Sequence, residues 1–226
     1  METVILLEAI ERSFKIKIRD EEAVKIITIG ELYDCIISKL SSNESSDCMT
    51  NRVFYKMRQA LIPLTNFSRI EIAPSTSMES LVEMRDRVKI WKYLSNYTGL
   101  RLPNLVRPKW IENVILLTFL NLMILGIVLL IFFRIWSVLI LSFLFLILAY
   151  KLTEKFAVYF PDYCSNLGDT VKVILGMNFG KISAEKGSWN QRDAWNAFQF
   201  IFFVELGVFP EEVKKEARIC ADLGLD

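Results

Sequence analysis

Residues 114–133 read VILLTFLNLMILGIVLLIFF, a run of 20 residues without a charged side chain. Arg134 interrupts the run, and residues 135–150 then add 16 more uncharged residues. A helix rises 1.5 Å per residue and the hydrocarbon core of a bilayer is about 30 Å thick, so the first run is long enough to span it. The second run reaches only about 24 Å, and it crosses if Lys151 extends to the interface or the bilayer thins locally. We therefore predict a two-helix transmembrane hairpin over residues 107–157.

A soluble core helix or a signal peptide fits this apolar block less well than a membrane segment does. A helix in the core of a soluble protein keeps one polar face, and neither run has such a face. A secretory signal peptide lies at the N-terminus, whereas this block begins after residue 110. The lipid bilayer is therefore the first partner that the sequence predicts.

Basic residues flank the block on both sides. Arg107 and Lys109 precede it, Lys151 and Lys155 follow it, and the turn offers only Arg134. Basic residues are enriched in cytoplasmic segments, and two crossings return the chain to its starting side. The sequence predicts an integral membrane protein with both termini in the cytoplasm.

Composition excludes several kinds of chemistry. The 226 residues have a net charge of +1, a mean hydropathy of +0.33, no histidine, and four cysteines that form no CxxC pair. Without histidine, a zinc or histidine-based catalytic site is hard to build, and the commonest general base is missing. The sequence also has no phosphate-binding glycine loop and no nucleophile elbow. We predict a protein that is not an enzyme, holds no metal or cofactor of its own, and has no nucleic-acid partner.

The two ends of the chain have the periodicity and capping signals of helices. Residues 2–13 place apolar side chains on one stripe, and Asp20 is expected to cap a short helix. Thr28, with Glu31 three residues later, predicts a capping box that opens a helix over residues 29–40. Asn190 and Gly207 predict the start and end of a helix over residues 190–206.

The ends also resemble the acyl carrier protein family, whose members bind phosphopantetheine. The stretch FVELGVFPEEVKKEARICADLGLD (residues 203–226) looks like the first helix and following loop of a carrier protein. The stretch METVILLEAIERSFKIKIRDEEAVKIITIGELYDCI (residues 1–36) looks like the part that follows the attachment serine. The chain thus resembles a circularly permuted carrier whose serine would fall between Asp226 and Met1, where none is present.

This resemblance implies an all-α fold in which both chain ends form one four-helix carrier-like module. Residues 190–226 would supply its first half, residues 1–40 its second half, and residues 41–51 would be a linker. The halves would pair within one chain or by a domain swap in a homo-oligomer. Any small amphipathic helical bundle is the alternative. The predicted core comprises Val4, Leu7, Ile10, Phe14, Ile29, Leu32, Phe198, Ile201, Phe202, Val204 and Leu223.

The middle of the chain shows a weaker form of the same pattern. Residues 52–106 are similar to the first two helices of a carrier, and residues 158–189 to its last part, with the hairpin inserted between them. In this second, degenerate module the serine position falls near Arg85, and Ser80 lies about four residues too early. A generic juxtamembrane helical domain is the alternative.

The resemblance also suggests site residues. The motif that would flank the serine comprises Asp222, Leu223, Gly224 and Asp226, and Thr3 is the nearest hydroxyl. Carrier proteins present an acidic face to basic partner enzymes, for which the candidates are Glu8, Glu11, Glu21, Glu22 and Glu31; an ordinary solvated helix face is the alternative. We expect a membrane-anchored docking scaffold for acyl-transfer or fatty-acid enzymes that lacks its own arm. The alternatives are a working carrier that holds 4′-phosphopantetheine on a serine outside this chain, and a small structural membrane subunit.

Overall fold

The computed structural model describes residues 2–40, 43–133 and 136–224, without the side chains of Phe132, Phe133 and Leu223. The fold is all-α, as predicted. In the described residues the helices are α1 (Glu2–Phe14), α2 (Asp20–Ala23), α3 (Ile29–Ser38), α4 (Met49–Leu61), α5 (Met78–Leu81), α6 (Arg87–Thr98), α7 (Lys109–Phe133), α8 (Ser137–Leu152), α9 (Leu167–Lys186), α10 (Gln191–Leu206) and α11 (Ile219–Leu223). Two short strands, β1 (Asn43–Glu44) and β2 (Ser188–Trp189), pair in parallel.

The chain divides into two compact units. The helical unit comprises Met1–Val82, Lys89–Pro103 and Tyr163–Asp226, and the hairpin unit comprises Glu83–Val88 and Asn104–Asp162. Each unit is described by itself below.

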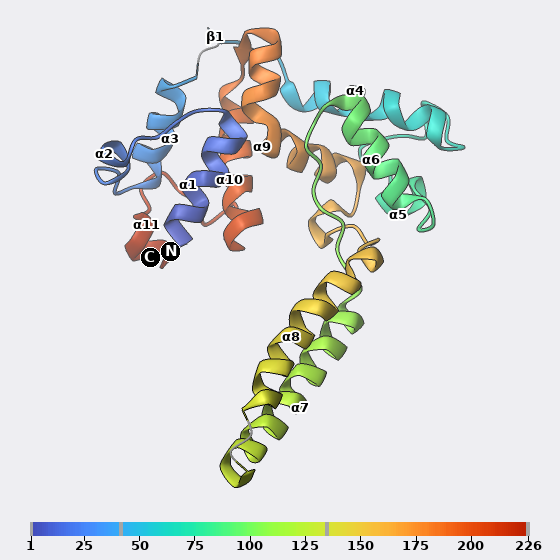
Figure 1. Ribbon diagram of the computed structural model, residues 1–226. Coiled ribbons are helices and arrows are strands. Elements are labelled where there is room, and N and C mark those ends of the chain that lie inside the picture. The colour runs from blue at the N-terminus through green and yellow to red at the C-terminus, as the bar shows by residue number, and fades with distance from the viewer. Residues whose placement is uncertain (1, 41–42, 134–135, 225–226) are drawn as a thin grey trace. The chain divides into compact units, whose positions relative to one another are not determined.

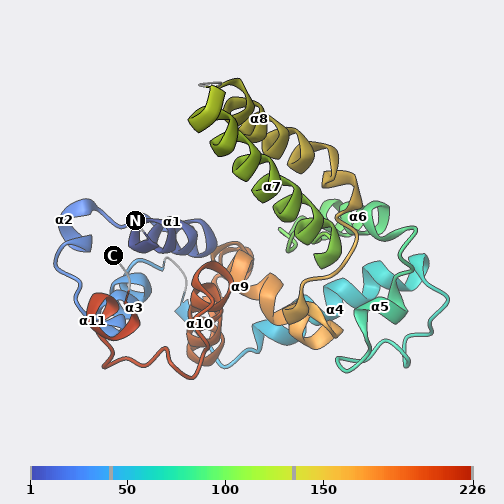
Figure 2. The ribbon, with the colours of Figure 1, turned by 90° about the horizontal axis from the view of Figure 1, so that it is seen from below.

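The helical unit brings the two chain ends together. Backbone hydrogen bonds run from Ile29 N to Ala217 O (2.9 Å), from Gly30 N to Lys215 O (2.9 Å) and from Ile219 N to Ile27 O (3.0 Å). Figures 1 and 2 both show α1, α3 and α11 at the same end of this unit. The predicted packing of the two end segments against each other is therefore present in the structure.

Most of the predicted core of this region is correct. Ile10, Phe14, Ile29, Leu32, Phe198, Ile201 and Phe202 are all buried. The prediction for Val4 is wrong, because its side chain is 59% exposed, and Leu7 and Val204 are only half-buried. The side chain of Leu223 lies outside the described residues. Leu6 and Ala9 are buried instead, since α1 packs against both α9 and α10, which turns its buried stripe away from the predicted one.

Helix α9 is the centre of this unit and contacts α1, α4 and α10. The methyl group that an alanine at Gly180 would carry would lie 2.0 Å from Phe14 O, so the two backbones touch here. The backbone of Asn178 leaves helical geometry and kinks α9 between its two halves. The end segments therefore do not pack only against each other, because α9 from the middle of the chain packs on both.

The predicted helix caps are correct where a side chain makes the cap. Thr28 and Glu31 form the predicted capping box, and Asn190 accepts hydrogen bonds from the N–H groups of Arg192 and Asp193. Gly207 ends α10 in the left-handed conformation, at φ 71°. The prediction for Asp20 is wrong: Arg19 is the N-cap of α2, and its N–H donates to Glu22 at 2.9 Å.

The hydrogen bonds that join the chain ends recur in the middle of the chain. Leu167 N donates to Thr76 O (2.9 Å), Gly168 N to Pro74 O (2.7 Å) and Met78 N to Ser165 O (3.1 Å). Antiparallel bridges pair Thr28 with Arg218 and Ser77 with Asn166 in the same way. Each bridge joins the N-cap residues of two helices, α3 with α11 and α9 with α5. The helical unit thus contains a local structural repeat.

The correspondence between the two copies of the repeat extends to the turns that follow α1 and α6. Lys15 follows α1 at φ 54°, and Gly99 follows α6 at φ 64°. Ile18 lies four residues after Phe14, the last residue of α1, and Leu102 lies four residues after Thr98, the last residue of α6. Both side chains are buried. In the copy that contains α1, the short helix α2 follows this turn. In the copy that contains α6, the hairpin is inserted at the corresponding place in the sequence.

In the hairpin unit, α7 and α8 pack side by side (Figure 1). Phe119 and Phe143 make an edge contact with ring centroids 5.6 Å apart, and Ser142 is buried and donates to the sulfur of Met123. Asn121 donates to Leu117 O within its own helix. Arg134 lies outside the described residues.

Among the described residues, one helix is long and apolar enough to cross a membrane, over Lys109–Ile131. Helix α8 is apolar but has only 16 residues. Side chains around both helices are largely exposed, including Trp110 and Trp136 at 66% each. The described helices therefore provide one candidate span, and the second crossing remains a prediction.

Candidate functional site

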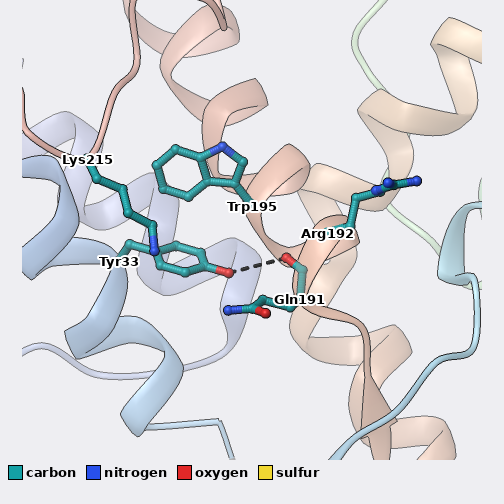
Figure 3. A pocket seen from close by; sticks show the side chains of 5 residues that line it. All are labelled: Tyr33, Gln191, Arg192, Trp195 and Lys215. Carbon is teal, nitrogen blue, oxygen red and sulfur yellow. Dashed lines mark hydrogen bonds between the residues drawn. The ribbon is translucent and has the colours of Figure 1, made fainter.

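A pocket of about 450 Å³ opens where the two chain ends meet. Tyr33 from α3, Gln191, Arg192 and Trp195 from α10, and Lys215 from the loop before α11 line it (Figure 3). Residues separated by more than 150 positions in sequence therefore form one site.

Aromatic rings and one cation define the interior of this pocket. The Tyr33 and Trp195 rings meet edge to face with centroids 4.9 Å apart. Nζ of Lys215 lies 5.3 Å from the Tyr33 centroid and 5.7 Å from that of Trp195, within cation–π range. The Tyr33 hydroxyl donates to Gln191 O at 3.3 Å, the dashed contact in Figure 3, whereas Arg192 extends away from the ring.

The backbone fixes the position of Lys215. Its carbonyl accepts the N–H of Gly30 at 2.9 Å, and a Cβ on residue 30 would lie only 2.9 Å from that oxygen. Glycine at this position therefore allows the loop to approach α3 closely. The close approach brings the Lys215 side chain over the two rings.

The pocket has the chemistry of a binding site. Burial, together with Glu44 and Asp34, raises the pKa of Tyr33 to about 12, so its hydroxyl stays protonated at neutral pH. Among the described residues that line the pocket there is no carboxylate and no thiol. An aromatic surface beside a cation suits a planar or anionic group on a partner.

Three of the five candidate acidic residues make bonds within the fold. Glu11 accepts the N–H of Ile18 at 2.6 Å and pairs with Lys17 at 3.0 Å. Glu22 pairs with Lys39 at 2.8 Å. Glu31 accepts the N–H groups of Ile27 and Thr28 at 2.7 and 3.0 Å. These bonds give the three carboxylates structural roles.

Glu8 and Glu21 differ from the other three. Both side chains are exposed, and neither makes an ion pair in the part of the chain that the structure describes. They are therefore the members of the predicted acidic face that remain available to a partner.

The motif that would flank an attachment serine is partly described. Asp222 accepts the N–H of Arg218 at 2.7 Å and so stabilises the start of α11. Gly224 ends this helix at φ 65°. Asp226 and Met1, and with them the predicted closeness of the two termini, lie outside the described residues.

The two hydroxyls nearest to the expected place, those of Thr3 and Ser80, do not fit an attachment site for 4′-phosphopantetheine. Thr3 lies within the first turn of α1, two residues after the position that the resemblance requires. In the repeat, Ser77 is the position equivalent to Arg218. Arg85 lies eight residues after Ser77, as Asp226 lies eight residues after Arg218, so the expected serine position in the second copy falls at or just after Arg85. Ser80 lies inside α5, where its hydroxyl donates to Ser77 O at 2.8 Å. Neither Thr3 nor Ser80 therefore occupies the place that the resemblance requires.

The cysteines are free, and one of them is deeply buried. Burial raises the pKa of Cys164 to about 12, so its thiol is protonated and a poor nucleophile. Within residues 2–40, 43–133 and 136–224 there is no group of three or more Cys, Asp or Glu side chains arranged to hold a metal ion.

Comparisons with family models, with curated proteins and with solved structures find no match to this chain. A relationship to carrier proteins therefore remains a prediction from the sequence. Sequence reasoning missed the pocket of Figure 3, although Lys215 lies in the loop that it compared with the family. The sequence alone does not show that the N–H of Gly30 pairs with the carbonyl of Lys215.

Proposed function

We propose that this protein is a membrane-anchored, carrier-like docking scaffold without a prosthetic arm. It would hold acyl-transfer or fatty-acid enzymes at the bilayer. The observation that carries the proposal is the set of three backbone hydrogen bonds that joins the loop before α11 to the start of α3. A permuted carrier module requires this junction between the chain ends.

Two further observations support a role in docking. The junction recurs between α5 and α9, so the chain has two copies of the backbone junction that a permuted carrier module requires. The module formed by the chain ends also exposes Glu8 and Glu21, together with the open pocket around Tyr33. Acidic and aromatic surface groups are suited to steering and anchoring a protein partner.

The proposal places the anchor in the hairpin. Lys109–Ile131 supplies one apolar span, and α8 would supply a second, shorter crossing that returns the chain to the cytoplasm. Both termini, and with them the carrier-like module, would then lie on the cytoplasmic side. Soluble acyl enzymes are accessible there.

The experiment measures binding of the full chain in nanodiscs to a fatty-acid ketosynthase, an enzyme class that recognises carrier proteins. Binding should be competed by an acyl carrier protein without its arm. Reversing both free acidic charges, Glu8→Lys with Glu21→Lys, should weaken binding by about tenfold, a loss of about 1.4 kcal/mol. The matched control, Glu211→Lys with Glu212→Lys, changes charge equally in the loop after α10.

Other results would change the assignment. If neither a ketosynthase nor an acyltransferase binds, the chain is better described as a structural membrane subunit. A gain of one phosphopantetheine in intact mass after co-expression with a phosphopantetheinyl transferase would make it a working carrier. Equal binding by the reversal variant and its control would remove Glu8 and Glu21 from the docking face.

A further inference from the structure

A second pocket, of about 330 Å³, lies in the helical unit and is surrounded by four basic side chains. We call it the basic pocket, and its charged lining consists of Arg12, Lys15, Arg101 and Lys181. These residues come from the end of α1, from the segment after α6 and from the second half of α9. The tertiary fold therefore gathers four positive charges at one place.

No carboxylate of the described residues pairs with these charges. Among the ion pairs in that part of the chain, none involves any of the four cations, although Glu11 and Glu185 pair with other lysines. Burial, with a further contribution from Arg12, lowers the pKa of Arg101. Like charges held together without a counter-charge repel one another, and a bound anion would relieve that repulsion.

The kink in α9 holds Arg101 in place. The side chain of Asn178 is buried, accepts the N–H of Arg101 at 2.8 Å and donates to its carbonyl at 2.8 Å. Nη2 of Arg101 donates to Arg12 O at 2.9 Å and also to Met177 O. The N–H groups on Nε and Nη1 of this guanidinium remain for a ligand.

Part of this arrangement has a structural role. Arg101 donates to carbonyls near the end of α1 and before the kink in α9, and Lys181 donates to Gly99 O after α6. Cations at helix C-termini are stabilising, because the carbonyl ends carry partial negative charge. This structural role accounts for Arg101 and Lys181. In the described residues, Arg12 and Lys15 make no comparable side-chain bonds to helix ends.

Lys15 is the residue that points to a ligand. It is the only non-glycine residue with positive φ in the part of the chain that the structure describes, at 54°. The repeat has Gly99 at the corresponding turn, where left-handed backbone carries no steric cost. A lysine in this conformation strains the backbone, and such strain is concentrated at functional positions.

We propose that the basic pocket binds a phosphate group, from either a phospholipid headgroup or a soluble phosphate ester. Donors from three separate segments suit the several oxygens of a phosphate better than a planar carboxylate, which one guanidinium can satisfy. A water molecule takes about 30 Å³ in the liquid, so the pocket has room for a phosphate and part of its ester. This inference does not depend on the proposed scaffold function.

The test uses the full chain in a sugar-based, phosphate-free detergent and isothermal titration calorimetry. One arm titrates glycerol 3-phosphate, and the other titrates dioctanoyl phosphatidic acid, which carries the same phosphate on a lipid. Binding in the first arm identifies soluble esters as ligands, and binding in the second arm alone identifies a lipid headgroup. In either case the affinity should fall as salt is added, because screening weakens charge attraction.

Lys15→Gly is the decisive variant. It removes one charge and the backbone strain, so it should raise the unfolding temperature while weakening phosphate binding by about tenfold. Arg12→Gln with Lys15→Gln should weaken binding further, whereas Lys25→Gln with Lys214→Gln removes two exposed charges elsewhere and should not change it. Absence of binding in both arms overturns the proposal. Equal binding by Lys15→Gly and the wild type, with a raised unfolding temperature, also overturns it, since Lys15 would then have no role toward a ligand.

Discussion

The N–H of Gly30 donates to the carbonyl of Lys215 at 2.9 Å and thereby joins the start of α3 to the loop before α11. A Cβ at residue 30 would lie 2.9 Å from that oxygen, closer than an unstrained contact permits. Gly30→Ala should therefore destabilise the helical unit by about 1–3 kcal/mol, despite the higher helix propensity of alanine. Urea unfolding followed by circular dichroism measures the change.

The repeat supplies a comparison for this variant. Gly168 makes the equivalent bond to Pro74, and a Cβ there would meet Pro74 atoms at 3.1 Å. Gly168→Ala should therefore cost less than Gly30→Ala, because the neighbour has to move by a smaller distance. If Gly30→Ala is as stable as the wild type, the junction is looser than the structure shows.

A second pair of glycines tests the contact between α1 and α9. Gly180→Ala would place a methyl group 2.0 Å from Phe14 O, so the helices have to separate and the Phe14–Phe179 ring contact at 4.9 Å is strained. We expect a loss of about 3 kcal/mol or more, the upper end of the range for overpacking. Gly176→Ala is the control in the same helix, since its methyl group would have ordinary contacts beginning at 3.5 Å. That variant should be neutral or stabilising by about 1 kcal/mol.

Local chemistry determined which features the sequence predicted well. The caps at Thr28 and Asn190 and the glycine end of α10 depend on residues a few positions apart, so they are readable from the chain. Helix α11 was missed because it has only five residues and its N-cap, Arg218, makes no side-chain cap. The exposed Val4 was assigned to the core because the sequence does not reveal that α9 also packs on α1.

The two pockets were beyond sequence reasoning for a related reason. Tyr33 and Lys215 are far apart in the chain, as are Lys15 and Lys181, and each pair meets only through the packing of α1, α3, α9 and α10. The left-handed backbone of Lys15 gives no signal in the residue type, because glycine is usual there. The apolar hairpin, by contrast, was evident from composition alone.

Acid should weaken the fold through Glu22. Hydrogen bonds from Lys39, and next from the backbone and side chain of Arg19, lower the pKa of Glu22 from 4.5 to about 2. Because the folded value lies below the unfolded one, the ionised carboxylate stabilises the fold above about pH 4.5. That contribution is lost as the pH falls toward 2.

The measurement is the difference in unfolding free energy between the wild type and Glu22→Gln. The variant should be less stable at pH 7, and the difference should shrink as the pH falls from 4.5 to 2. Glu21→Gln is the control, because its exposed side chain makes no ion pair in the described residues. A difference that is constant with pH would show that Glu22 acts through packing and not through its charge.

The second membrane crossing is tested by labelling single cysteines from outside intact cells. In a background with Cys35, Cys48, Cys164 and Cys220 replaced by serine, Ser137→Cys should react with a membrane-impermeant maleimide. Lys155→Cys should react only after permeabilisation, because a hairpin returns the chain to the cytoplasm. If Lys155→Cys reacts in intact cells as readily as Ser137→Cys, α8 does not cross and the protein has one span.

The missing serine gives the most direct test of the carrier relationship. The chain as it stands should gain no mass when it is co-expressed with a phosphopantetheinyl transferase, since neither Thr3 nor Ser80 lies at the place that the resemblance requires. A permuted chain that begins at Cys48, continues through Asp226, one inserted serine and Met1, and ends at Asp47 would restore the family motif. The new termini fall in an exposed loop between β1 and α4, where permutation is best tolerated.

This permuted chain should fold, because the hydrogen bonds between Gly30 and Lys215 and between Ile219 and Ile27 already hold the two ends together. It should then gain one phosphopantetheine, which intact-mass spectrometry detects, and the same chain with alanine in place of the inserted serine should gain nothing. Circular dichroism of the alanine form separates failure to fold from failure to be modified. A folded serine form that is never modified would show that the chain ends resemble a carrier only in their helices, and the scaffold proposal would lose its main support.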